Sequence, residues 1–229
     1  MREPTVASVM TANVITVTPE TPFKDVVATL SGNGVSAVPV IGPNGRLLGV
    51  VSEADLLPKQ EFHGGADPVP HGVARRRARW FRALGLYAAE LMTTPTFTIE
   101  PDASVTLAAR RLAEHRVRRL FVVDKEGWLV GVVSRRDVLG TFLRADDAIR
   151  ADIEEQVLGA PLGPSPESTV RVTVRDGVVT VDGEVEKRSD TGSCVYLIRA
   201  VPGVVSVRSN LTYRTDDLAP TRNWTGFSP

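Results

Sequence analysis

The chain has 229 residues, of which 42% are hydrophobic and 24% charged, and its formal net charge is zero; these values are ordinary for a globular protein of one or two domains. The middle of the chain is basic and both ends are acidic, which disfavours nucleic acid as a partner but leaves room for a local anion site. Cys194 is the single cysteine, so an internal disulfide framework is excluded and a reducing compartment is indicated. No signal-like core follows Met1 and no apolar run approaches about 18 residues, so we expect a cytoplasmic protein.

An internal repeat organises the first two thirds of the chain. The pattern Gly-Val-Val-Ser-x-x-Asp at residues 49–55 returns at residues 131–137, 82 positions later. The same offset aligns Met10-Thr11 with Met92-Thr93, and no gap is needed as far as Leu57. A repeat of this length predicts two copies of one supersecondary unit that stack on each other.

Each copy is predicted to have the order β-α-β-β-α. In the first repeat, residues 7–57, we expect a short strand at 15–18, an amphipathic helix from Phe23 to the Gly-Asn-Gly at 32–34, strands at 38–41 and 47–51, and a helix from Ser52. The second repeat, residues 88–143, is predicted to have a helix ending near 114–116 and strands at 120–123 and 129–133.

Residues 58–87 form the linker between the repeats. Residues 58–74 contain several Gly, Pro and His without periodicity, and we expect them to be irregular. The basic stretch Arg75 to Arg82 then leads into an amphipathic helix predicted to run into Leu91-Met92. This helix could bind anionic lipid or nucleic acid, or its aromatic residues Trp80 and Phe81 could pack on the repeats; we favour packing.

Residues 146–213 form a separate unit with the predicted order α-β-β-α-β. A helix at 148–158 and a loop at 159–166 precede a hairpin at 170–185 that turns at Asp176-Gly177. That turn pairs Val174 with Val179 and places the apolar residues on one face. A helix from Ser189-Asp190 to Arg199 and a strand at 205–213 follow, and residues 214–229 are predicted to be a loose tail. The whole chain is therefore expected to be α+β (mixed α/β).

Two families are recognisable in these patterns. Residues 7–143 resemble a tandem pair of CBS domains, named after cystathionine β-synthase, through Val-Met-Thr at 9–11, Leu-Met-Thr at 91–93 and the two Gly-Val-Val-Ser-x-x-Asp segments. Residues 146–213 resemble a BON domain through the segments 177–185 and 201–211. The CBS resemblance implies a pseudo-twofold sandwich with two clefts, an adenosine ligand (AMP, ADP, ATP or S-adenosylmethionine) and a homodimer. The BON resemblance implies a small module linked to phospholipid or envelope association.

Four residues at strand-to-helix junctions are the leading candidates for ligand binding: Ser52, Asp55, Ser134 and Asp137. Free backbone N–H groups and the helix dipole favour an anion at such a junction. In the family, the Asp accepts hydrogen bonds from the ribose hydroxyls, and the Ser reaches the ribose or a phosphate. Ser-x-x-Asp is also a capping box, so a purely structural role stays open.

The remaining candidates are assigned from the family's cleft and from charge. The resemblance places Thr16 and Thr98 at the adenine pocket, with Val38, Pro39, Leu120 and Phe121 as apolar walls, although Val38 and Leu120 could equally be core positions. Arginines beside a helix start suit a polyphosphate, or else form a solvated face; they are Arg119, Arg135 and Arg136. The sequence contains no metal-ligand spacing and no catalytic arrangement, so we expect no obligatory cofactor, no metal and no enzymatic activity.

The function predicted from the sequence is regulatory. The CBS pair would sense an adenine nucleotide, and the BON module would relay its binding to a partner or surface. The alternative is a dimeric adaptor that senses nothing and binds a protein partner or anionic phospholipid through the BON module and the basic helix. Such an adaptor could be peripheral at the inner membrane surface.

Overall fold

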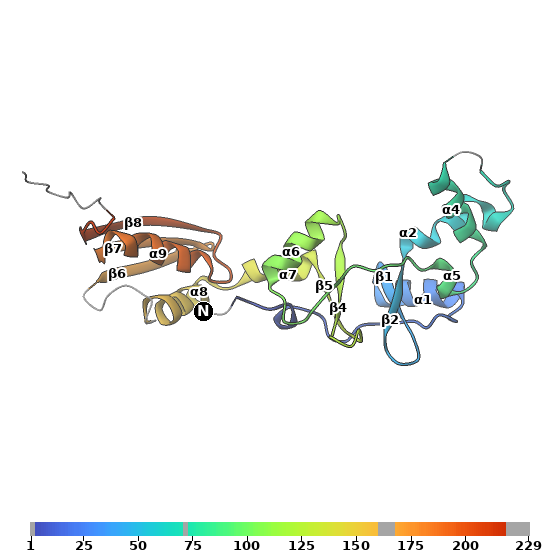
Figure 1. Cartoon of the computed structure of the whole chain (residues 1–229), viewed down its shortest axis with the longest axis horizontal. Coiled ribbons are helices and arrows are strands. Elements are labelled where there is room, and N and C mark those ends of the chain that lie inside the picture. The colour runs from blue at the N-terminus through green and yellow to red at the C-terminus, as the bar shows by residue number, and fades with distance from the viewer. Residues whose placement is uncertain (1–2, 71–72, 160–167, 219–229) are drawn as a thin grey trace, which may run out of the picture. The chain divides into compact units, whose positions relative to one another are not determined.

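A computed structural model describes residues 3–70, 73–159 and 168–218 (Figure 1). They divide into two compact units, one from Thr5 to Val138 and the other mainly from Leu139 onward. The first unit combines helices with two small sheets and the second combines helices with one, so the predicted α+β class is confirmed. Within the described ranges, no helix is long and apolar enough to span a bilayer.

The first repeat begins with a 3₁₀ turn (Val6–Ser8) and continues through α1 (Phe23–Asn33), β1 (Ala37–Ile41), β2 (Leu47–Ser52) and α2 (Glu53–Leu56). β1 and β2 pair antiparallel, with Val38 opposite Val51. The strand expected at 15–18 is reduced to one parallel bridge between Val17 and Val40. Val17 uses both its N–H and its carbonyl on β1, and the next residue that would face β1, Pro19, has no N–H to continue the ladder.

The second repeat has the same order. It contains α5 (Ala88–Leu91), β3 (Thr98–Ile99), α6 (Val105–Glu114), β4 (Arg119–Val123), β5 (Leu129–Ser134) and α7 (Arg135–Gly140). β3 runs parallel to β4, and β4 pairs antiparallel with β5. Leu120 faces Val133 across the β4–β5 ladder, as Val38 faces Val51 in the first repeat.

The two repeats exchange their entry segments. Val6 is fully buried in the core of the second repeat, whereas Leu91 is fully buried in the core of the first. Backbone bridges connect Thr11 to Val132 and Thr93 to Val50, so the exchange is reciprocal. Each repeat is therefore completed by residues of the other, which explains why residues 5–138 form one unit.

The linker is more ordered than its composition predicted. It contains α3 (Pro58–Glu61), a 3₁₀ turn (His63–Gly65) and α4 (Ala74–Leu84). The prediction of a helix continuing from the basic stretch into Leu91 is wrong, because α4 ends at Gly85 and α5 starts separately at Ala88. The Glu90 carboxylate accepts hydrogen bonds from the N–H groups of residues 86 and 87, which fixes this new helix start.

The second unit has the predicted order of its main elements. A 3₁₀ turn (Thr141–Leu143) leads to α8 (Asp146–Ile153), which continues as a π-helical turn (Glu154–Leu158), and β6 (Thr169–Arg175), β7 (Val178–Lys187), α9 (Arg188–Arg199) and β8 (Ser206–Thr215) follow. Val174 pairs with Val179, as the turn predicted. Most of the predicted loop at 159–166 lies outside the described residues, and β8 extends into the predicted tail, whose residues 219–229 also lie outside them.

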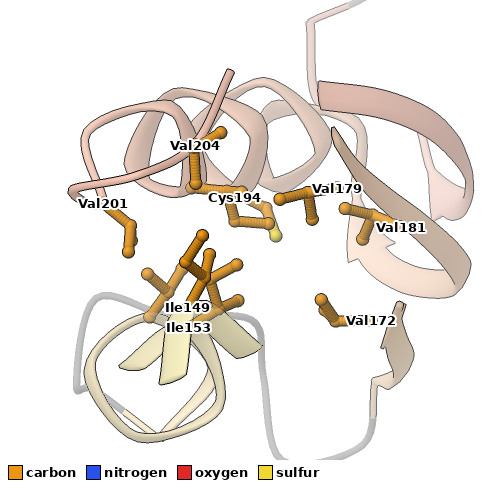
Figure 2. Close-up of a cluster of buried hydrophobic side chains, with 10 residues drawn as sticks. Ile149, Ile153, Val172, Val179, Val181, Cys194, Val201 and Val204 are labelled. Atoms are coloured by element: carbon orange, nitrogen blue, oxygen red, sulfur yellow. The ribbon is translucent and has the colours of Figure 1, made fainter. Parts of the chain in front are cut away.

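The sheet of this unit has the order β6-β7-β8, and its core lies between the sheet and the two helices. Figure 2 shows Ile149 and Ile153 of α8 pointing towards Cys194 of α9, with Val179 and Val181 of β7 alongside. These five side chains are at most 2% exposed. Burying side chains of this kind stabilises by about 1.5–3 kcal/mol each, so this core can hold the unit together.

Candidate functional site

A cavity of about 480 Å³ lies between the two repeats. This volume is within the roughly 300–1,000 Å³ range of small-molecule sites. We call it the second-repeat cavity, because the Ser-x-x-Asp motif of the second repeat lies on its wall. Its lining residues are Thr11, Asn13, Val14, Ile15, Gly34, Val35, Ser36, Ala37, Pro39, Arg119, Phe121, Val132, Ser134, Arg136 and Asp137.

Ser134 and Asp137 form the polar corner of this cavity. One carboxylate oxygen of Asp137, Oδ2, accepts hydrogen bonds from the Ser134 N–H and hydroxyl, both at 2.7 Å. Among the described residues we find no partner for the other oxygen, Oδ1, and the side chain is half-buried. The helix cap therefore uses one oxygen only, so capping and ligand binding are compatible roles for the same residue.

Arg119 connects the two repeats at the cavity wall. Its guanidinium donates to the Ser36 hydroxyl at 2.6 Å and to the Ala37 carbonyl at 3.1 Å, so a β4 side chain holds the start of β1. Burial, and secondarily the nearby charge of Arg118, lower the pKa of Arg119 from its ordinary value. Arg136 adds a second, exposed guanidinium to the lining, and the cavity therefore combines one carboxylate with two cationic groups.

The structure distributes the residues predicted from the sequence over three environments. Six of them line the second-repeat cavity: Pro39, Arg119, Phe121, Ser134, Arg136 and Asp137. Val38 and Leu120 are fully buried in the cores of the first and second repeats. Thr16, Thr98 and Arg135 are not among the lining residues, and the Arg135 Nε donates to the Val117 carbonyl instead.

The sequence reasoning missed the contribution of the first repeat to this cavity. The residues concerned are Thr11, Asn13, Val14, Ile15, Gly34, Val35, Ser36 and Ala37. They are mostly small or apolar, so their residue types gave no signal. The repeat offset could have pointed to Thr11, because it relates Thr11 to Thr93. The exchanged entry segments bring each of these threonines beside the Ser-x-x-Asp motif of the opposite repeat.

The corresponding motif of the first repeat is occupied by the chain itself. We call Ser52, Asp55 and Thr93 the first-repeat carboxylate site. Oδ2 of Asp55 accepts from the Ser52 N–H at 2.9 Å, while Oδ1 accepts from the Thr93 hydroxyl at 3.0 Å and from the Arg82 guanidinium at 2.9 Å. Asp55 is only 6% exposed. The two motifs are thus alike in sequence but different in occupancy.

Metal binding and cysteine chemistry are the two other kinds of site to consider in the described residues. Across residues 3–70, 73–159 and 168–218, no group of three or more His, Cys, Asp or Glu side chains is arranged to hold a metal ion. Cys194 is buried, and burial raises the pKa of its thiol to about 11, so it is not an activated nucleophile.

A pair of repeats that share a cavity, followed by a small α+β unit, defines the class of protein. Comparison with protein families identifies both parts: the CBS domain model matches residues 6–60 and 88–144, and the BON domain model matches residues 145–215. The chain belongs to the CBS domain family, with a tandem pair of CBS domains followed by a BON domain.

Two similar proteins and one crystal structure each match about three fifths to two thirds of the chain. The chain is 30% identical over 142 residues to the chloroplastic CBS domain-containing protein CBSX2 of Arabidopsis thaliana, covering 58% of this chain and 60% of that one. An uncharacterized protein of Methanopyrus kandleri is 26% identical over 157 residues, covering 69% of this chain and 70% of that protein. A crystal structure of CBSX2 in complex with AMP has a TM-score of 0.53 and 33% identity, covering 61% of this chain and 96% of that one.

Proposed function

We propose that this protein is a regulatory sensor that binds an adenine nucleotide in the second-repeat cavity. The observation that carries the proposal is the Asp137 carboxylate on the wall of a cavity of about 480 Å³, with Oδ1 unpartnered among the described residues. The complex of CBSX2 with AMP supports the choice of ligand class.

Each part of the cavity has a chemical role in this proposal. The Asp137 carboxylate accepts hydrogen bonds from the two ribose hydroxyls, and the Ser134 hydroxyl contributes at the same corner. Phe121 and Pro39 offer apolar contacts for the adenine ring. Arg119 and Arg136 supply positive charge for phosphate groups, which planar guanidinium groups bind in a bidentate manner.

Thermal unfolding with AMP, ADP, ATP and S-adenosylmethionine tests the proposal. A ligand present at about 100 times its dissociation constant stabilises the folded state by roughly 2.7 kcal/mol. We expect AMP, or one of the other three, to raise the unfolding temperature of residues 5–138 by several degrees. No shift with any of the four at millimolar concentration would contradict nucleotide binding.

In the regulatory part of the proposal, the nucleotide changes the equilibrium between arrangements of the two repeats. Because residues 11–39 and 119–137 both line the cavity, a ligand that contacts both sides favours the arrangement in which those contacts are best. The BON module would carry this change to a partner. Hydrogen exchange of residues 168–218 with and without AMP measures the relay. We expect AMP to change the exchange of these residues, and identical exchange in both states would contradict the relay.

The homodimer predicted from the family stays part of this proposal. A groove of about 300 Å³ lies along α1, α2 and α3, and its lining includes Phe23, Val27, Leu56 and Leu57. Leu57 is 61% exposed and Val27 is 37% exposed, and exposed apolar side chains that share one groove support a partner surface here. Light scattering on purified protein measures the mass directly, and a monomer at all concentrations would exclude this part.

The surface of α4 favours a second candidate, the adaptor. Phe81 is 55% exposed and Leu84 is 44% exposed, and Arg75 to Arg77 beside them are also exposed. Cationic and aromatic groups together suit an anionic membrane surface. Trp80 does not add to this surface, because its indole N–H donates to the Asp67 carbonyl at 2.8 Å. Flotation with vesicles of anionic phospholipid tests the adaptor, and protein that stays in the bottom fraction would exclude it.

A further inference from the structure

Arg82 of the linker helix occupies the first-repeat carboxylate site. Its Nη1 lies 2.9 Å from Oδ1 of Asp55, and its Nη2 donates to the Thr93 hydroxyl at 3.0 Å. The Thr93 hydroxyl in turn donates to the same Oδ1 at 3.0 Å. The three side chains therefore form a closed cluster in which both oxygens of the Asp55 carboxylate are bonded within the chain.

The second repeat provides an internal comparison for this cluster. Asp137 and Thr11 stand 82 positions from Asp55 and Thr93, and both line the second-repeat cavity. Asp137 is half-buried and has no arginine partner among the described residues, whereas Asp55 is 6% exposed and paired. The serine, the aspartate and the threonine are the same in both repeats. What distinguishes the two carboxylates is that, among the described residues, Arg82 pairs with Asp55 and no arginine pairs with Asp137.

Several contacts hold α4 so that Arg82 faces Asp55. The Lys59 ammonium donates to the Gly85 carbonyl at 2.7 Å, at the end of the helix, and Arg79 forms an ion pair with Glu61 of α3. Ala83, next to Arg82, is fully buried. α4 is therefore fixed to α3 at two points, and these contacts hold Arg82 beside the Asp55 carboxylate.

We infer that Arg82 is a built-in occupant that closes the first-repeat site to nucleotide, so that the wild-type chain binds one nucleotide and carries a second, latent site. This inference rests on the proposed function. The guanidinium donates to the Asp55 oxygen that corresponds to Oδ1 of Asp137, the oxygen we assign to the ribose hydroxyls. A nucleoside can use Asp55 only when Arg82 leaves, and the latent site takes the same ligand class, an adenine nucleotide.

The test is the stoichiometry of AMP binding measured by isothermal titration calorimetry on the full chain. We expect one AMP per chain for the wild type, two for Arg82→Ala, and one for the double variant Arg82→Ala with Asp137→Asn. The matched control is Arg79→Ala, which removes the other arginine ion pair of the same helix and leaves Arg82 on Asp55; it should still bind one. Arg82→Gln, which keeps the first three carbons of the side chain but is shorter and uncharged, repeats the test if Arg82→Ala does not fold.

The outcomes separate this inference from the proposed function. If the wild type binds one AMP and both Arg82 variants also bind one, the inference is wrong and the second-repeat cavity stands. If the wild type binds none but an Arg82 variant binds one, Arg82 does close the first site and the assignment to the second-repeat cavity is wrong. Two AMP molecules on the wild type, or none on any variant, overturn the inference.

Discussion

The guanidinium of Arg119 donates a 2.6 Å hydrogen bond to the hydroxyl of Ser36, and this contact joins the second repeat to the first at the wall of the second-repeat cavity. A second bond from the same group reaches the Ala37 carbonyl. A contact that is part of the cavity wall and also connects the repeats couples the stability of the pair to the geometry of the site.

Arg119→Ala should therefore affect both stability and binding. It removes the hydrogen bonds that the charged guanidinium donates to the half-buried Ala37 carbonyl and Ser36 hydroxyl, and losing hydrogen bonds of this kind costs about 1–3 kcal/mol. We expect the free energy of unfolding of residues 5–138 to fall by that amount in urea titrations and the affinity for AMP to fall with it. Arg118→Ala is the control, because Arg118 is exposed and does not line the cavity; its stability should stay within about 0.5 kcal/mol of the wild type.

The exchange of entry segments depends on two glycines. A Cβ at Gly131 would lie 2.5 Å from Sδ of Met10, and a Cβ at Gly49 would lie 2.5 Å from Sδ of Met92. Either substitution by alanine should destabilise the unit by about 1–3 kcal/mol through overpacking, as measured by urea unfolding. Gly32→Ala in α1 has open space around it and should be neutral or slightly stabilising. Equal effects at all three positions would contradict the packing described.

Much of the fold follows from sequence periodicity because the main elements are amphipathic and bounded by clear turn signals. The hairpin at Asp176-Gly177 gave the pairing of Val174 with Val179 directly, since a two-residue turn leaves one register. The helix break at Gly85 was missed because it depends on Glu90. The carboxylate of Glu90 accepts hydrogen bonds from two backbone N–H groups and so starts a new helix, which the spacing of apolar residues does not reveal.

The candidate site was less predictable than the fold. Ser134 and Asp137 were found because their motif repeats, but the cavity also needs Ile15, Gly34 and other small or apolar residues of the opposite repeat. Which residues meet across the repeats depends on the exchanged entry segments, a long-range relationship that no local pattern contains. The pairing of Arg82 with Asp55 was hidden for the same reason, since the two lie 27 positions apart on different helices.

In the BON unit, Asp146 fixes the hairpin turn. Its two carboxylate oxygens accept from the N–H groups of Asp176 and Gly177, at 2.8 and 2.9 Å. Asp146→Ala should destabilise this unit by about 1–3 kcal/mol in urea unfolding, because two turn N–H groups lose charge-assisted bonds. Asp147→Ala should change stability by less than about 0.5 kcal/mol, because Asp147 is 91% exposed and pairs only with Arg150 among the described residues. Similar losses for both variants would count against the role of Asp146.

Cys194 should make the stability of the BON unit depend on alkaline pH. Burial, with a smaller contribution from Asp190, raises the pKa of its thiol to about 11, whereas an unfolded cysteine has a pKa of about 8.5. Unfolding then releases a proton between these values, so stability should fall as pH rises from about 8.5 towards 11 and should be unaffected by this group below that window. Cys194→Ala should have a shallower pH slope in urea unfolding; an unchanged slope would contradict the assignment.

Reactivity of the same thiol provides a second check. A buried, protonated thiol reacts slowly with iodoacetamide, since the thiolate is the nucleophile. We expect little labelling of the folded protein at pH 8 and complete labelling in urea, as read by mass spectrometry. Rapid labelling in the folded state would mean that Cys194 is accessible.

Calorimetric titration of two matched variants with AMP decides whether Asp137 binds an adenine nucleotide in the second-repeat cavity. Asp137→Asn keeps the size of the side chain and removes the charge that accepts the ribose hydroxyls; we expect its affinity for AMP to fall at least about tenfold, equivalent to about 1.4 kcal/mol. Asp55→Asn makes the same change at the carboxylate that Arg82 occupies and should bind AMP as the wild type does. Wild-type affinity in Asp137→Asn, or loss of binding only in Asp55→Asn, would contradict the account.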